Sequence, residues 1–311
     1  MNSEHTPVLL HEVIDLLAPK KNQNFVDATC GFGGHTEAIL KLTGPKGIVI
    51  GIDQDEEALK SATERLKPFG ERFKPHFGNF SQTAEAVDGL KIDGGILADL
   101  GVSSYQIDTA KRGFSFQKTG PLDMRMSKET SLTAEKIVND WSKEEIAVIL
   151  KQYADERFAV RIASAICRER GVKRLETTTK LAEIVKEAIP RKFWPKGVNP
   201  ATKTFQAIRI AVNDELNQLK QFLPQALKIL EPHARIAVIT FHSREDYIVK
   251  KILKEEANPC TCPPDFPKCV CEKKPKIKII TKKSIQATSQ EMDENPRSRS
   301  ARLIVAEKIN S

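Results

Sequence analysis

The chain has 311 residues and a formal net charge of +8, long enough for one large domain or two ordinary ones. No stretch approaches the roughly 18 apolar residues of a membrane helix, and the first residues show neither a basic region nor a small-residue cleavage site. We therefore expect a cytoplasmic protein, neither membrane-spanning nor secreted. Aromatic residues make up only 6% of the chain, which fits an α/β protein with a Val, Ile and Leu core.

The first chemical signal is a strand followed by a glycine-rich turn and a helix. The apolar run 25–28 predicts a buried parallel strand, which breaks at Gly31, Gly33 and Gly34 before an amphipathic helix begins. Glycines let a ligand approach the backbone, and the N–H groups at a helix start are available to donate. This arrangement predicts a site for a nucleotide-like ligand.

A second strand, 47–53, ends in a carboxylate. Asp53 stands 22 positions after Gly31, close to the offset of about 20 residues at which an acidic residue receives ribose hydroxyls. A dinucleotide dehydrogenase would have a third glycine where this chain has Thr36. Asp27 followed by Gly-x-Gly-Gly is instead typical of S-adenosylmethionine (SAM) methyltransferases, with NAD as the rival cofactor.

Later strands are expected to add to the same sheet. The third ends in a turn that presents Phe80 to a flat adenine ring, and the fourth ends at Asp99. Because open α/β sheets bind ligands at the carboxyl ends of their strands, Asp99 is a candidate functional residue. We expect the third and fourth strands near 72–77 and 94–99, the remaining strands at 235–241, 276–281 and 301–308, and a loop at 289–300.

The alternation of strands and helices stops near Asp108. The chain then shows helical patterns with no strand-like run between them, which predicts an all-helical domain inserted between the fourth and fifth strands. We place this substrate-recognition domain at 111–205, and the discontinuous cofactor-binding domain at 1–110 and 206–311. The expected helices are 134–141, 144–153, 157–170 and 178–188, followed by one long helix at 205–230.

The positive charge is concentrated in one segment. Residues 157–209 contain 13 Lys or Arg and 4 Asp or Glu, a local charge of +9, which leaves the rest of the chain near neutral. Such concentration favours a phosphate-rich partner, above all a nucleic acid. Lys173 and Arg174 are among the candidate contacts.

Four of the six cysteines lie in one Pro-rich stretch. Four thiols so close in a cytosolic protein indicate a metal rather than disulfides. The single residue within each pair is harder to fit around a tetrahedral ion than the usual two, so a structural zinc stays open. Four thiolates leave no open coordination position, and no metal is assigned to the catalytic site. These residues are Cys260, Cys262, Cys269 and Cys271.

With these features, the chain resembles the bacterial 16S ribosomal RNA cytosine-N4 methyltransferases, the MraW family, along essentially its full length. Eight ordered segments carry the resemblance, so a chance match is not credible. They are 5–10 (HTPVLL), 31–36 (GFGGHT), 99–104 (DLGVSS), 112–116 (RGFSF), 120–126 (GPLDMRM), 199–206 (NPATKTFQ), 241–243 (FHS) and 295–299 (NPRSR).

The resemblance implies a SAM-dependent methyltransferase with a Rossmann-like doubly wound sheet and the helical insertion. The implied substrate is a cytidine in the decoding region of 16S rRNA, within the small ribosomal subunit, methylated on its exocyclic N4. No membrane partner is expected, and a homodimer stays open. The cofactor positions implied by the resemblance are Gly33, Gly34, His35, Asp53, Phe80, Asp99 and Gln106.

The implied reaction gives Asp99 a catalytic role. The exocyclic nitrogen of cytosine is a poor nucleophile, so a site must accept one N–H hydrogen bond and aim the lone pair at the methyl group. Phe114, Phe116 and Phe241 are candidates for stacking a splayed base. Two alternatives stay open: methylation of another amine, on DNA or protein, and a SAM-fold RNA-binding or assembly factor without turnover.

Overall fold

The computed structural model describes residues 7–263 and 270–309, so that His5 and Cys269 lie outside the described residues. The chain divides into two compact units, the first formed by Met1–Gly101 with Leu216–Ser311 and the second by Val102–Glu215. The assignment of a cofactor domain to 1–110 and 206–311, and of a substrate domain to 111–205, stays a prediction.

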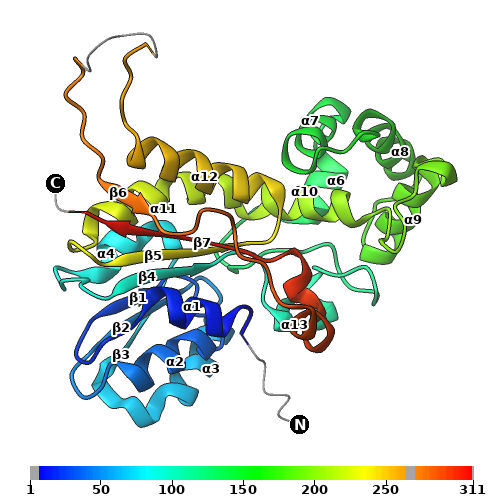
Figure 1. Cartoon of the computed structure of the whole chain (residues 1–311). Helices are drawn as coiled ribbons and strands as arrows, with labels where there is room; N and C mark the ends of the chain where they lie inside the picture. Colours follow the sequence, from blue (N-terminus) through cyan, green and yellow to red (C-terminus); the bar gives the residue numbers. More distant parts are fainter. Residues whose placement is uncertain (1–6, 264–269, 310–311) are drawn as a thin grey trace. The chain divides into compact units, whose positions relative to one another are not determined.

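The first unit contains a seven-stranded sheet in the order β3-β2-β1-β4-β5-β7-β6 (Figure 1). Its first five strands run parallel, and β7 pairs antiparallel with both β5 and β6. The predicted α/β doubly wound class is confirmed. The strands are β1 Phe25–Asp27, β2 Val49–Asp53, β3 Phe73–Phe77, β4 Gly95–Asp99, β5 Arg235–Thr240, β6 Ile277–Ile279 and β7 Arg302–Lys308.

The strand order reverses beside β1. This strand pairs with β2 on one side and with β4 on the other, so that Asp27 lies opposite Gly51 and Leu97. Asp53 and Asp99 therefore stand two residues further toward the carboxyl ends of their strands. Ligands of doubly wound sheets bind in the crevice at such a reversal. The three aspartates predicted from the sequence thus meet at one edge of the sheet.

Helices cover both faces of this sheet. Apolar residues of α1, α2 and α3 pack with the strands in one core, and Figure 1 shows α11 and α12 on the opposite side. Because β1, β2 and β4 are buried between these layers, their sequences read as nearly continuous apolar runs. The helices are α1 Leu10–Leu17, α2 Gly34–Leu42, α3 Glu56–Leu66, α4 Thr83–Val87, α11 Glu215–Ile229, α12 Ser243–Ala257 and α13 Ser289–Glu294.

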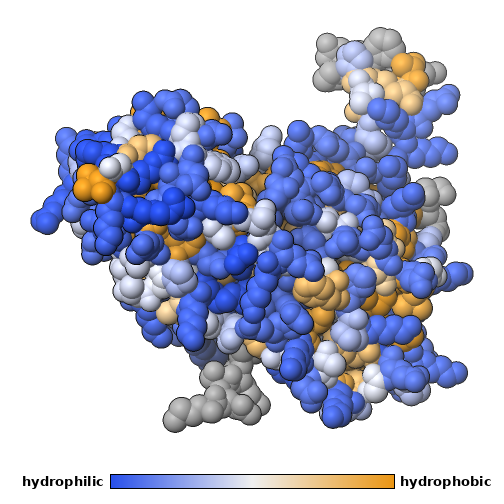
Figure 2. Space-filling model, turned by 180° about the vertical axis from the view of Figure 1, so that it is seen from behind, coloured by the Kyte–Doolittle hydropathy of each residue, from blue (hydrophilic) through white to orange (hydrophobic). Residues whose placement is uncertain are grey.

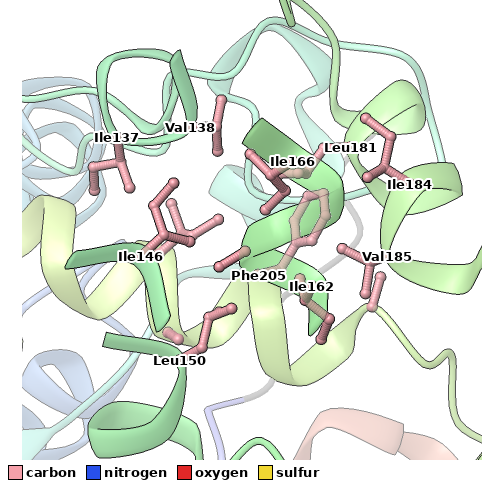
Figure 3. Close-up of a cluster of buried hydrophobic side chains, with 14 of the residues drawn as sticks. Ile137, Val138, Ile146, Leu150, Ile162, Ile166, Leu181, Ile184, Val185 and Phe205 are labelled. Atoms are coloured by element: carbon pink, nitrogen blue, oxygen red, sulfur yellow. The ribbon is translucent and has the colours of Figure 1, made fainter. Parts of the chain in front are cut away.

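The second unit is helical and has its own core. Its helices turn Ile, Leu and Val side chains toward one another, with Phe205 of α10 among them (Figure 3). Asn213, at the end of α10, joins this helix to the loop before α6. Its side chain accepts from the amide of Met126 at 2.8 Å and donates to the carbonyl of Met124 at 2.8 Å. The helices are α5 Ser104–Asp108, α6 Ala134–Asp140, α7 Lys143–Ala154, α8 Ala159–Val172, α9 Thr178–Ala188 and α10 Thr202–Asn213.

Two sequence predictions of local structure were wrong. The single helix expected at 205–230 is two helices, because Asp214 adopts a left-handed conformation with φ of 50° between α10 and α11. The loop expected at 289–300 contains α13 and a 3₁₀ turn, Pro296–Ser300. Thr288 caps α13 by accepting from the amide of Glu291, which stabilises a helix too short and polar to show a periodic pattern.

Within the described ranges, no helix is long and apolar enough to cross a membrane. Figure 2 shows that hydrophilic residues cover most of the face seen there.

Candidate functional site

Asp53 fastens the glycine-rich turn after β1 to the end of β2. Its Oδ2 accepts from the amide of Gly31 at 2.7 Å, and its Oδ1 accepts from the amide of Asp55 at 2.8 Å. A carboxylate offers about four acceptor positions, so Asp53 can receive further donors at this edge. Gly31 and Asp53, which stand 22 positions apart in the sequence, are thus in direct contact.

Packing accounts for two of the predicted glycines. Gly33 has φ of +79°, and a Cβ atom there would lie 3.0 Å from a methyl carbon of Leu66. A Cβ atom on Gly34 would overlap the ring of Pro7. Neither position accepts a side chain without displacing its neighbours, which explains why α2 begins with glycine. Their contact with a cofactor stays a prediction.

Asp27 lies in the interior between the predicted ligand residues. The hydroxyl of Thr36 donates to its Oδ2 at 2.7 Å, in the place where a dinucleotide site would have glycine. Loss of solvent around the carboxyl groups raises the pKa of Asp27 to about 6 and that of Asp53 to about 6. The raised pKa values of these two carboxyl groups make this edge sensitive to added positive charge.

The backbone of Asp99 is hydrogen-bonded, whereas one oxygen of its side chain has no partner among the described residues. Its amide donates to the hydroxyl of Thr29 at 2.6 Å, which fixes the end of β4 against the turn after β1. Its Oδ1 is buried and, among the residues that the structure describes, has no hydrogen-bond partner. Burial raises the pKa of Asp99 well above its ordinary value, and the charges of Asp27 and Glu245 add to this rise. Such an acceptor is suited to a donor brought by a ligand.

His35 stands beside Asp99. Its Nε2 donates to the carbonyl of Val8 at 3.0 Å, and its Nδ1 lies 3.9 Å from Oδ2 of Asp99. The ring is almost fully buried, so the first turn of α2 and the segment before α1 hold it in place. The structure thus places His35 beside Asp99, and it places Asp53 against the glycine turn through the amide of Gly31.

Two other predicted cofactor residues have structural partners of their own. The rings of Phe80 and the buried Phe222 pack at nearly a right angle, with their centres 5.4 Å apart. Gln106 belongs to the second unit, where its side chain accepts from the amide of Ser103 at 3.1 Å and caps α5. For both residues, contact with the cofactor stays a prediction.

Sequence reasoning missed Glu245 and Thr29 as members of this edge. Glu245 accepts from the amide of Phe241 at 2.8 Å just beyond β5, and its charge acts on Asp99. The available signal was its place in the first turn of the helix that follows a central strand. Thr29 could have been found by its position two residues after β1, where its hydroxyl reaches the amide of Asp99.

The edge therefore combines three carboxyl groups of raised pKa with a buried acceptor, Oδ1 of Asp99, that has no hydrogen-bond partner among the described residues. Carboxylates receive hydroxyl groups as acceptors, and an added cation lowers the raised pKa of each neighbouring carboxyl group. A ligand with ribose hydroxyls and a positive charge matches both properties. Acceptors of this kind can hold and orient a ligand that donates hydrogen bonds.

The family of the chain is shown by a match to the model of the MraW methylase family over residues 2–309. The chain belongs to the MraW methylase family. It is 51% identical over 308 residues to "Ribosomal RNA small subunit methyltransferase H" of Halothermothrix orenii, covering 98% of this chain and 99% of the relative. The same name belongs to relatives in Symbiobacterium thermophilum, 48% identical over 313 residues, and Geobacter sulfurreducens, 48% identical over 311 residues. These two matches cover 100% and 99% of this chain and 98% and 100% of the relatives, respectively.

The second unit of this methylase carries cations over aromatic rings. The guanidinium carbon of Arg157 lies 4.7 Å from the centre of the Phe193 ring, and that of Arg191 lies 5.9 Å from the Trp194 ring. Phe193 and Trp194 remain 40% and 37% exposed, which is unusual for such large apolar side chains. We call this set the basic aromatic surface: Arg157, Phe158, Arg191, Lys192, Phe193 and Trp194.

Other candidates in the second unit are engaged in the fold. Arg174 pairs with Glu135 at 2.6 Å and with Asp140 at 3.1 Å, so reversing its charge would disturb the unit itself. Phe114 and Phe116 pack against the helical core, and the ring of Phe116 lies 5.0 Å from that of Phe205. Stacking of a base on either phenylalanine stays a prediction.

Proposed function

We propose that this MraW-family methylase transfers a methyl group from SAM to the exocyclic N4 of a cytidine in the decoding region of 16S rRNA. The names of the curated relatives refer to the ribosomal RNA of the small subunit, and we take the small ribosomal subunit as the substrate. The observation that carries the proposal is the buried, unsatisfied Oδ1 of Asp99 at the reversal of strand order.

The residues at this edge fit the cofactor. Asp53 has acceptor positions left for ribose hydroxyls after its bonds to Gly31 and Asp55. The raised pKa values of Asp27 and Asp99 favour a ligand that brings positive charge. When bound, SAM supplies an electrophilic methyl group on a sulfonium ion. Because that ion loses its charge during transfer, a carboxylate that acts on the amine assists the reaction more than one that stabilises the bound cation.

Asp99 provides the positioning that the amine needs. Its Oδ1 accepts one N–H of the exocyclic group and turns the nitrogen lone pair toward the methyl carbon. The bond from the amide of Asp99 to Thr29 fixes the backbone that carries this carboxylate, and Nδ1 of His35 lies 3.9 Å from its other oxygen. The methylated amine then loses a proton, for which the carboxylate of Asp99 is a suitable acceptor.

The basic aromatic surface fits the RNA part of the substrate. Exposed aromatic rings stack on unpaired bases, while arginine and lysine neutralise phosphates. All six residues of the basic aromatic surface lie in the segment 157–209, which carries the local charge of +9. We therefore assign this surface to rRNA, and the strand-end carboxylates to cofactor and target amine.

Methyl transfer from radiolabelled SAM tests the proposal. Isolated small subunits, naked 16S rRNA and duplex DNA are offered separately, and nucleoside analysis then locates the label. We expect label in N4-methylcytidine, with small subunits the preferred substrate. Label in another nucleoside or in DNA would contradict the assigned target. Tight SAM binding with no transfer to any of the three would favour an assembly factor without turnover.

A further inference from the structure

The thiols of three cysteines gather at the tip of the loop between α12 and β6. The Sγ atoms of Cys260, Cys262 and Cys271 all lie within 4.8 Å of one another, and those of Cys260 and Cys271 are 3.8 Å apart. Zinc bonds thiolate sulfur at about 2.3 Å, so a tetrahedral site places two sulfurs about 3.8 Å apart. A disulfide would need about 2.05 Å. The distance between Cys260 and Cys271 is that of two ligands around one ion, and the third sulfur lies within 4.8 Å of both.

The backbone supports the same interpretation. The amide of Val270 donates to Sγ of Cys262 at 3.3 Å. Such bonds orient metal-bound ligands and spread the charge that a thiolate carries, as other outer contacts do in metal sites. In the sequence, the one-residue spacing of Cys260 and Cys262 argued against a tetrahedral ion. In the structure, their two sulfurs nevertheless lie within 4.8 Å of each other.

Two contacts join the arms of this loop at its base. Its base is closed where Lys276 pairs with Glu256 at 2.9 Å and its amide donates to the Glu256 carbonyl at 3.0 Å. At the tip, Val270 is 67% exposed, and none of the described residues there belongs to a hydrophobic core. Figure 1 shows the two arms of the loop leaving α12 and β6. In such a segment, a metal link can supply folding free energy that a core does not.

We propose that Cys260, Cys262 and Cys271 supply three of the ligands of a structural zinc ion that folds this loop. The ion stands apart from the strand-end carboxylates and takes no part in methyl transfer. Soft thiolate ligands select zinc over magnesium and calcium, which prefer oxygen. Metal binding and deprotonation of the three thiols occur together, so the affinity falls as the pH is lowered.

Metal analysis of untagged protein tests the proposal. Elemental mass spectrometry should find about one zinc per chain in the wild type and at least fivefold less in Cys260→Ser and in Cys271→Ser. The matched control is Cys167→Ser, which changes a thiol in the second unit and should retain its zinc. Equal zinc in all four proteins, or none in wild type made with added zinc, would overturn the assignment. Iron in place of zinc would also contradict it.

A second measurement separates loss of metal from loss of fold. SAM affinity by calorimetry should stay within twofold in Cys260→Ser, while limited trypsin digestion at Lys273 and Lys274 should become at least fivefold faster. Cobalt added to the metal-free wild type should produce the absorption of a tetrahedral thiolate site. Unchanged digestion after zinc removal, or a cobalt spectrum typical of octahedral oxygen ligands, would contradict a structural thiolate site.

Discussion

The amide of Gly31 donates to Oδ2 of Asp53 over 2.7 Å, joining the turn after β1 to the end of β2. The same carboxylate accepts from the amide of Asp55 through its other oxygen. Asp53 therefore shapes the glycine turn as well as offering acceptors to a ligand. Loss of this carboxylate should affect the cofactor in both ways, which makes it the clearest residue for testing the cofactor site.

We expect Asp53→Ala to lower SAM affinity at least tenfold. One hydrogen-bonding group to a charged partner contributes about 1.5–3 kcal/mol, and the variant also releases the amide of Gly31. Isothermal calorimetry measures the affinity. The matched control is Asp55→Asn, which keeps an acceptor for the amide of Glu57 at the start of α3 and should bind SAM normally. SAM affinity in Asp53→Ala equal to that of the wild type would remove Asp53 from the cofactor site.

The second prediction concerns the pH dependence of stability. The pKa of Asp27 is raised by burial from 3.8 to about 6 in the folded protein. Between these two values the folded state binds more protons than the unfolded state, so this group lowers the free energy of unfolding as the pH rises through the window. The full loss is roughly 3 kcal/mol above pH 6.

Asp27→Asn removes this titration and keeps one acceptor for Thr36. The free energy of unfolding of the variant, relative to wild type, should therefore increase as the pH rises from about 4 to about 7. Urea unfolding at several pH values measures the difference, with Asp88→Asn as the exposed control at a helix end. A difference between Asp27→Asn and wild type that does not change with pH would show that Asp27 has no raised pKa.

The third prediction concerns the basic aromatic surface. Phe193→Ala combined with Trp194→Ala should weaken binding to small subunits at least fivefold, because each base–aromatic stack contributes about 1–3 kcal/mol. Lys192→Glu should reduce the slope of log affinity against log salt concentration by about 1 or more. Filter binding at several salt concentrations measures both effects, and SAM affinity should not change.

Val172→Ala is the matched control for this surface. Val172 is 87% exposed at the end of α8, in the same unit, and is not part of the basic aromatic surface. It should bind small subunits like the wild type. A similar loss in this control, or wild-type binding by the Phe193→Ala, Trp194→Ala protein, would exclude the surface as the rRNA contact.

Much of the sheet and of its functional edge was predictable from the sequence. Each central strand is a short apolar run, and Asp53 and Asp99 stand at strand ends, where the physics of parallel sheets places ligands. The helices of the second unit were predictable because their apolar spacing reflects one shared core. These features depend on local pattern, which a sequence displays directly.

The features that were missed depend on the backbone conformation of a single residue or on contacts between distant residues. The apolar pattern continues across Asp214, and only its left-handed backbone separates α10 from α11. Helix α13 is held partly by Glu291, which accepts from the amide of Leu9 across 282 positions. Likewise, the approach of His35 to within 3.9 Å of Asp99 requires the three-dimensional arrangement of α2 and β4. No periodic signal reports such contacts.

The most direct test of the central claim is single-turnover methyl transfer by Asp99→Asn to small subunits at saturating SAM. The asparagine keeps the size and one acceptor oxygen but removes the charge. Calorimetry sets the SAM concentration needed for saturation in each protein. If Asp99 orients the target amine, the rate at saturation falls by about 10²-fold or more. A rate within a few-fold of wild type, with only the SAM affinity reduced, would contradict this role and leave Asp99 as a cofactor ligand.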